Sequence, residues 1–182
     1  MRPRTMSPER LVDELGRTLI LQDLSAQERR RFAPLCELRE YDSGERLVEQ
    51  DSIGSDLHIL IEGTVDICVR GKERDEVRVS TVGKGDVLGE ASIFTDLPRT
   101  ASVIAAQGCL AAAVPRERLF AYCEANPRAG LRIFGFVIYS LLRRLGSTSR
   151  ELALEREAAV TADDLDRLHA LLPKSLEDML GS

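Results

Sequence analysis

The sequence predicts a mainly β protein, an antiparallel β-barrel or sandwich with helices on either side of it. Between residues 36 and 114, short β-branched runs alternate with turn signals, a spacing typical of many short antiparallel strands. Outside this region, apolar residues recur at helical spacing. With 182 residues, 43% of them apolar, the chain is long enough for one such domain with extra helices.

The segment before the strands, residues 1–35, is predicted to be helical from residue 8 onward. Leu11, Leu15 and Leu19 recur at helical spacing. Ser25 with Glu28 three residues later is a capping-box pattern, which predicts the start of a second short helix.

Residues 36–114 are predicted to form the barrel. The Glu62-Gly63 pair lies between two alternating runs and predicts a tight hairpin. His58 lies in one of these runs and is expected to line a face of the barrel. The predicted strand runs are 47–50, 58–70, 77–82, 100–106 and 109–114.

Residues 115–159 are predicted to form a short helix, 115–125, and a long one that begins at Pro127 after the Asn126 cap. An apolar stripe on the long helix is either a coiled-coil seam with a second subunit or a face packed on the protein's own barrel. Residues 160–182 are predicted to be an acidic helical tail. The stripe consists of Leu131, Phe134, Ile138, Leu141 and Leu145.

Composition argues against several classes of protein. The net charge of −5 is unlike that of a protein that coats nucleic acid. No apolar run is long enough to span a membrane and the N-terminus lacks a secretory signal, so the expected location is the cytoplasm. The two histidines, His58 and His169, make neither a metal site nor a catalytic group, and no enzyme is expected. The cysteines, widely spaced, are expected in the core as free thiols: Cys36, Cys68, Cys109 and Cys123.

The stretch from Gly89 to Val103, GEASIFTDLPRTASV, carries the strongest functional signal. Gly89 permits close approach of the backbone, and residues 90–93 can form one helical turn whose free N–H groups favour an anion. Arg99 follows Pro98 and can bring its guanidinium to the same point. A phosphate bound there would leave Glu90 to accept hydrogen bonds from hydroxyl groups, as a nucleotide requires. The alternative is a solvated or weakly paired Glu and Arg.

This stretch resembles the phosphate-binding cassette of the cyclic nucleotide-binding domain family, which includes catabolite activator proteins and protein kinase A regulatory subunits. Residues 42–45, 58–67 and 83–89 also resemble segments of that family, so the resemblance covers about residues 24–146. It implies a jelly roll, or double-stranded β-helix, with the cassette at 89–103.

The resemblance also implies site residues. Glu90 would accept a hydrogen bond from the ribose 2′-hydroxyl, and Arg99 would pair with the cyclic phosphate. The backbone N–H groups of Ser92 and Ala101 would also reach the phosphate, and Gly89 and Ala91 complete the turn. Ile93 falls where the family has an apolar hinge contact to its helices.

Further ligand contacts follow from the resemblance, each with a simpler alternative. Thr100 would contact phosphate or base, or is an ordinary strand-start hydroxyl. Val79, Val82 and Leu88 would line the purine pocket, or are ordinary core. Thr148 and Ser149 correspond to a pair that touches the base in the catabolite activator proteins.

Together these features predict a stand-alone bacterial sensor without a helix-turn-helix. Its ligand is cAMP, with cGMP possible, and no other cofactor is expected. Binding would reposition the long helix, through which a homodimer is expected to form over 127–159. An unknown downstream protein is its further partner, with neither DNA nor membrane. The alternatives are a ligand-free interaction scaffold of the same fold and a truncated transcription regulator similar to catabolite activator proteins.

Overall fold

The computed structural model describes residues 1–71 and 76–159, with side chains described up to Leu145. The chain divides into two units, Met1–Leu141 and Leu142–Ser182. The first unit contains every described strand. The acidic tail predicted at 160–182 lies outside the described residues.

The strands form two antiparallel sheets, which confirms the predicted mainly β fold with flanking helices. One sheet has five strands in the order β1-β2-β9-β4-β7, and the other has four in the order β3-β8-β5-β6. The bounds are β1 Arg2–Pro3, β2 Glu37–Tyr41, β3 Arg46–Val48, β4 Leu57–Glu62, β5 Thr64–Arg70, β6 Glu76–Gly83, β7 Val87–Leu88, β8 Ser102–Ala105 and β9 Cys109–Val114.

The central strands of the five-stranded sheet, β4 and β9, are buried on both of their faces. Side chains alternate between the faces of a strand, so Leu60 of β4 points to one side and Ile59 and Ile61 to the other. Leu60 joins the core between the two sheets, together with Val65 of β5 and other residues of the second sheet. Ile59 and Ile61 join a second core that the helices complete. In sequence, β4 and β9 are therefore nearly continuous apolar runs.

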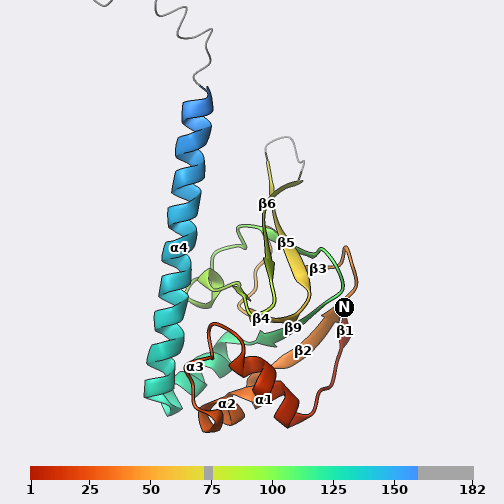
Figure 1. Ribbon diagram of the computed structural model, residues 1–182, viewed down its shortest axis with the longest axis vertical. Coiled ribbons are helices and arrows are strands. Elements are labelled where there is room, and N and C mark those ends of the chain that lie inside the picture. The colour runs from red at the N-terminus through yellow and green to blue at the C-terminus, as the bar shows by residue number, and fades with distance from the viewer. Residues whose placement is uncertain (72–75, 160–182) are drawn as a thin grey trace, which may run out of the picture. The chain divides into compact units, whose positions relative to one another are not determined.

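Two short helices and a 3-10 turn precede the second strand: α1 (Pro8–Gly16), α2 (Ala26–Phe32) and η1 (Ala33–Leu35). The predicted capping box is confirmed, since Ser25 N donates to Glu28 Oε2 at 2.7 Å and Glu28 N to Ser25 Oγ at 3.2 Å. Figure 1 shows α1 and α2 gathered with α3 beside β2 and β9.

The hairpin predicted at Glu62-Gly63 is wrong. β4 belongs to the five-stranded sheet and β5 to the four-stranded sheet, so the chain crosses between sheets at Gly63. Gly63 has φ +86, and a Cβ there would lie 2.5 Å from the carbonyl oxygen of Gly108. β5 alternates because one of its faces points toward the inter-sheet core, whereas β4 is buried on both faces. Two strand-forming runs on either side of a Glu-Gly pair therefore do not distinguish a hairpin from a crossing between sheets.

Two helices follow the last strand: α3 (Arg116–Ala125) and α4 (Pro127–Ala159). The predicted start of α4 at Pro127 is confirmed, and the helix continues through the last described residue, 159. In the first unit, α4 buries Ala129, Ile133 and Val137 completely. Leu131 and Ile138 of the predicted stripe are 77% and 55% exposed. The helix therefore packs on the core through Ala129, Ile133 and Val137, and not through Leu131 and Ile138.

Gly63→Ala should destabilise the protein by roughly 2–4 kcal/mol, because the new Cβ adds a backbone clash to an unfavourable φ. Gly44 has φ +82 but open space around it, so Gly44→Ala should cost only about 1–2 kcal/mol of strain. Gly135→Ala, in α4 with nothing within 4 Å, should stabilise by about 0.5–1 kcal/mol. Urea unfolding of the three variants checks this order, and equal effects at Gly63 and Gly44 would contradict the clash.

Candidate functional site

The predicted cassette is the loop that connects β7 to β8, and it contains the 3-10 turn η2 (Ala91–Ile93). Gly89, directly after β7, has φ +77. A Cβ at this position would lie 2.4 Å from Arg99 Nη1 and 2.8 Å from the carbonyl oxygen of Asp56. Glycine is required here both for its backbone angle and for the space that the guanidinium fills.

Arg99 lies inside the loop with only 6% of its surface exposed. Its Nη1 donates to Ser92 Oγ at 2.8 Å and to the Gly89 carbonyl at 3.5 Å, and its Nη2 donates to the Asp56 carbonyl at 2.9 Å. The structure therefore brings together three predicted site residues, Gly89, Ser92 and Arg99, around one guanidinium.

A segment that the sequence did not single out holds Arg99 in place. The Arg99 N–H donates to the Ser52 carbonyl at 2.9 Å, and the Asp51 N–H donates to the Arg99 carbonyl at 2.9 Å. Gly54 lies against the guanidinium, since a Cβ there would be 3.4 Å from Arg99 Nη2. The loop between β3 and β4 thus fixes the backbone of Arg99 and covers its side chain.

The side chain of Arg99 donates to two carbonyls and a hydroxyl, which are uncharged acceptors. Burial lowers the pKa of Arg99, and the nearby carboxylates of Asp56 and Glu90 act in the opposite direction. The Asp56 carboxylate accepts a hydrogen bond from Arg39 Nη1 at 3.2 Å. Glu90, 2% exposed, lies at the start of η2. A buried cation in such surroundings favours an anion.

His58 on β4 lies beside the strand that leads into the cassette. It is paired with Leu88 of β7 and Ala113 of β9 and shares its strand face with Leu60 of the inter-sheet core. The side chain is 3% exposed, and neither ring nitrogen has a hydrogen-bond partner among the described residues. Burial, followed by the positive charge of Arg99, lowers the pKa of His58 to about 4.

The other predicted ligand contacts differ in burial. Leu88 is buried in the inter-sheet core, and Val82 packs against that core from the edge strand β6. Val79, also on β6, is 50% exposed. Thr100 and Ala91 are exposed, and Ala101 is half-buried just before β8. The side chains of Thr148 and Ser149 lie outside the described residues.

The cassette is attached to the helices by apolar contacts from η2 and the residue after it. Ile93 is 1% exposed and lies in the core that the helices share with the five-stranded sheet. The ring of Phe94 contacts Phe120 of α3 and Phe134 of α4, with centroids 6.3 and 5.7 Å apart. The sequence analysis predicted Ile93 as a hinge contact and did not predict Phe94. Phe94 directly follows Ile93 in the same motif, so its position in the sequence could have indicated this contact.

Arg116, at the start of α3, adds polar contacts to the same junction. Its Nη2 donates to the carbonyls of Ser92 and Thr95 at 2.6 and 2.7 Å, and its Nη1 donates to Asp96 Oδ1 at 2.7 Å. Two of these acceptors are backbone atoms of η2 and the residues after it, so the contact fixes the path of the chain. Sequence alone gave no signal for it, because Arg116 is one of many arginines on helical segments.

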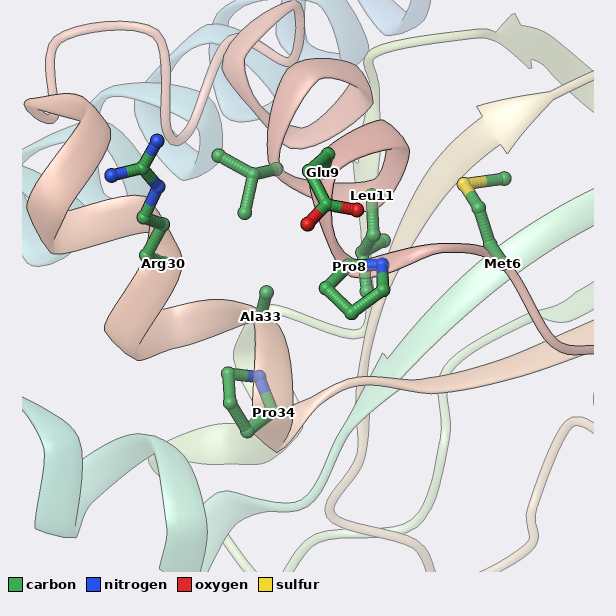
Figure 2. Close-up of a pocket in the computed structure, with 8 residues that line it drawn as sticks. Met6, Pro8, Glu9, Leu11, Arg30, Ala33 and Pro34 are labelled. Carbon is green, nitrogen blue, oxygen red and sulfur yellow. The ribbon is translucent and has the colours of Figure 1, made fainter.

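A cavity of about 430 Å³ lies elsewhere, between the N-terminal segment, α1 and α2 (Figure 2). It shares no residue with the cassette. Its charged groups, Glu9 and Arg30, are both solvent-exposed, and the remaining lining is apolar. It therefore lacks the buried cation that distinguishes the cassette. The apolar lining consists of Met6, Pro8, Leu11, Val12, Ala33 and Pro34.

Among the described residues, no group of three or more His, Cys, Asp or Glu side chains is arranged to hold a metal ion. The four cysteines are free thiols, and burial raises the pKa of Cys36 to about 12. No described helix is both long and apolar enough to cross a bilayer.

Comparison with known proteins agrees with this geometry. Residues 38–126 match the family model described as "Cyclic nucleotide-binding domain". A cAMP-dependent protein kinase regulatory subunit from Mycosarcoma maydis is 36% identical over 87 residues, which cover 48% of this chain and 16% of that protein. The type II regulatory subunit from Drosophila melanogaster is 35% identical over 89 residues, 49% of this chain and 23% of that protein. The chain thus spans less than a quarter of these relatives.

Solved structures show the same fold. A cyclic nucleotide-binding domain from Methylobacillus flagellatus has a TM-score of 0.68 at 20% identity and covers 82% of this chain and 83% of its own. The catabolite activator protein of Thermus thermophilus has a TM-score of 0.65 at 23% identity, covering 75% and 62%. The regulatory domain of Toxoplasma gondii protein kinase A, crystallised with cAMP, has a TM-score of 0.61 at 23% identity, covering 77% and 50%.

Arg116→Met should loosen the cassette, because it removes the three hydrogen bonds that join α3 to residues 92–96. We expect a loss of about 1–3 kcal/mol in the free energy of unfolding and faster amide exchange at Phe94 and its neighbours. Arg118→Met, which removes one exposed ion pair with Glu37, is the matched control. Hydrogen exchange read by mass spectrometry distinguishes the two, and unchanged exchange in Arg116→Met would contradict the proposed restraint.

Proposed function

We propose that this protein, whose residues 38–126 form a cyclic nucleotide-binding domain, is a regulatory sensor that binds cAMP, with cGMP as the second candidate. The observation that carries this proposal is the buried guanidinium of Arg99, enclosed by Gly89, Ser92 and the Asp56 carbonyl. The relatives from Mycosarcoma maydis and Drosophila melanogaster are regulatory subunits of cAMP-dependent protein kinase, which supports cAMP as the ligand. The protein would act by binding and release, and no catalysis is proposed.

The phosphate would bind first to the guanidinium. Arg99 now donates to neutral acceptors, and exchanging one of them for a phosphate oxygen turns a bond between a cation and a dipole into one between opposite charges, which the forked guanidinium can make with two oxygens at once. The Ser92 N–H donates to the Gly89 carbonyl at 3.1 Å. Its predicted contact with phosphate would therefore require η2 to change shape on binding. Ala101 keeps its proposed role as a second backbone donor.

The sugar and base would bind on either side of this point. Glu90 lies next to the Gly89 turn and is buried, and its carboxylate is proposed to accept a hydrogen bond from a ribose hydroxyl. Leu88 and Val82 would contact the base from the inter-sheet core. Thr100, exposed beside Arg99, is proposed to contact the base edge or the phosphate.

The signal would pass through the back of the cassette. A phosphate that draws Arg99 away from the Gly89 carbonyl and Ser92 Oγ removes two of the contacts that hold η2 in its present position. Ile93 and Phe94 on the other side of η2 are packed against the helices. A ligand shifts such an equilibrium only by its difference in affinity for the two positions. We propose that the two positions differ in how α3 and α4 contact η2.

A second candidate function is a ligand-free interaction scaffold of the same fold. One observation favours it: Arg99 and the Ser92 N–H both have acceptors within the protein, so the loop satisfies part of its own hydrogen-bonding capacity. The two candidates differ in thermal shift, because only a ligand that binds the native state raises the melting temperature.

A homodimer through α4 is also proposed. Leu131, Ile138 and Tyr139 are each more than half exposed although the same helix buries Ala129, Ile133 and Val137. Exposed apolar residues at helical spacing are suited to a second helix of the same kind. The downstream protein partner is left to experiment, and no role for DNA is proposed.

Arg99→Ala should weaken cAMP binding at least tenfold, because a charge-assisted hydrogen bond contributes about 1.5–3 kcal/mol. Arg99→Lys, which keeps the charge without the fork, should bind more weakly than wild type and more tightly than Arg99→Ala. Arg118→Ala, at an exposed ion pair on α3, is the matched control and should bind as wild type does. Calorimetric titration of refolded, nucleotide-free protein with cAMP and with cGMP measures each constant.

Wild-type affinity in Arg99→Ala would remove the proposed site. Absence of binding of either nucleotide to folded wild-type protein would favour the ligand-free scaffold. A preference for cGMP over cAMP would keep the sensor and change its signal.

Ile138→Glu should convert a dimer to a monomer, because it introduces a charge on the exposed apolar face of α4. Arg128→Glu, on an exposed position of the same helix, is the control and should leave the mass unchanged. Light scattering after size exclusion gives the molar mass. A wild-type monomer at all concentrations would contradict the proposed dimer.

A further inference from the structure

We propose that His58 is part of the nucleotide site and takes up a proton when the anionic ligand binds, so that affinity rises as pH falls. This inference rests on the proposed function and deepens it, because it assigns a new residue and a pH dependence to the same site.

The position of His58 carries the inference. Its β4 position is paired with Leu88, which directly precedes the Gly89 turn of the cassette. Its side chain lies on the strand face that points between the two sheets, with 3% of its surface exposed. Neither Nδ1 nor Nε2 meets hydrogen-bond geometry with a described residue, although the Asp56 carbonyl lies close enough to favour the protonated ring. Because buried polar groups are nearly always hydrogen-bonded, an imidazole left this way beside a ligand loop is a candidate ligand contact.

The charged groups around His58 come from three segments. Arg99 of the cassette and Arg39 of β2 disfavour a second positive charge, whereas Asp56, just before β4, favours it through its carboxylate and its carbonyl. The strands paired with β4 present Ala113 and Leu88 opposite His58, and neither side chain is charged. Glu90 acts on the same group of charges through Arg99. Desolvation and the two arginines together keep the ring neutral.

An anionic ligand changes this balance. The cyclic phosphate carries one negative charge near neutral pH, and it would lie against Arg99, the cation whose charge opposes protonation of His58 most strongly. Its charge therefore raises the pKa of His58 in the complex above that of the free protein. A pKa that is higher in the complex means that binding takes up a proton and is tighter at lower pH. If the complex restores the ordinary value of about 6.5, affinity at pH 5.5 exceeds that at pH 7.5 by about tenfold.

The test is calorimetric titration of the full chain with cAMP at pH 5.5, 6.5 and 7.5, in two buffers of different ionisation enthalpy at each pH. The difference between buffers gives the number of protons taken up on binding. We expect uptake of about half a proton at pH 6.5 and tighter binding at pH 5.5 in wild type. His58→Gln, which keeps a hydrogen-bonding side chain but cannot titrate, should lose both the uptake and the pH trend. His169→Gln, which removes the other histidine, should retain both.

Binding of cAMP without proton uptake and without a pH trend would overturn this inference and leave the proposed function standing. Proton uptake that persists in His58→Gln and disappears in His169→Gln would also overturn it. No binding of cAMP or cGMP at any pH would overturn both. If His58→Gln fails to fold, NMR titration of the wild-type imidazole resonances with and without cAMP decides, since an unchanged pKa of His58 on binding contradicts the proposal.

Discussion

The buried guanidinium of Arg99 is the interaction on which the arrangement of the site depends. It accounts for Gly89, where any side chain would collide with it, and for Gly54, where a side chain would crowd it. The backbone of Arg99 is paired with Ser52 and Asp51. Burying a cation among carbonyls is unfavourable unless its donors are all used, and the cassette and the loop before β4 supply acceptors from both sides. An anion that replaces a neutral acceptor at this point gains more there than it would on the surface, because the group is already desolvated.

The five-stranded sheet links this site to the helices. Its inner face lines the inter-sheet core and its outer face packs against the helices. Adjacent residues of one strand therefore contact different parts of the molecule. Leu88 faces the interior while Val87 joins the helical core. The cassette that follows has the same division: Arg99 and Ser92 meet on one side, and Ile93 and Phe94 extend to α3 and α4 on the other.

Local patterns identified most of the elements, and the errors arose where two arrangements share one pattern. The capping box at Ser25 and the start of α4 at Pro127 depend on a few neighbouring residues, so sequence was sufficient. At Gly63, strand-forming runs on both sides indicated a hairpin, but two such runs also result when the chain crosses between sheets. Arg99 could be found because its motif is contiguous. Three other residues lie near the cassette only because of the fold, since they are far from Arg99 in sequence. They are Asp56, His58 and Arg116, at separations of 43, 41 and 17 positions.

The short length of η2 favours coupling between the two sides of the cassette. A turn of three residues has no interior that could absorb a displacement, so a change at Ser92 on the ligand side moves Ile93 next to it. Arg116 bonds the Ser92 carbonyl from behind while Arg99 bonds the Ser92 hydroxyl from the front. Ser92 is thus held by two arginines from different elements. A ligand that competes with Ser92 for Arg99 would leave Arg116 as the arginine that holds this residue. Closely packed interiors respond to such a change by moving between discrete positions rather than by bending gradually, which is the property a sensor requires.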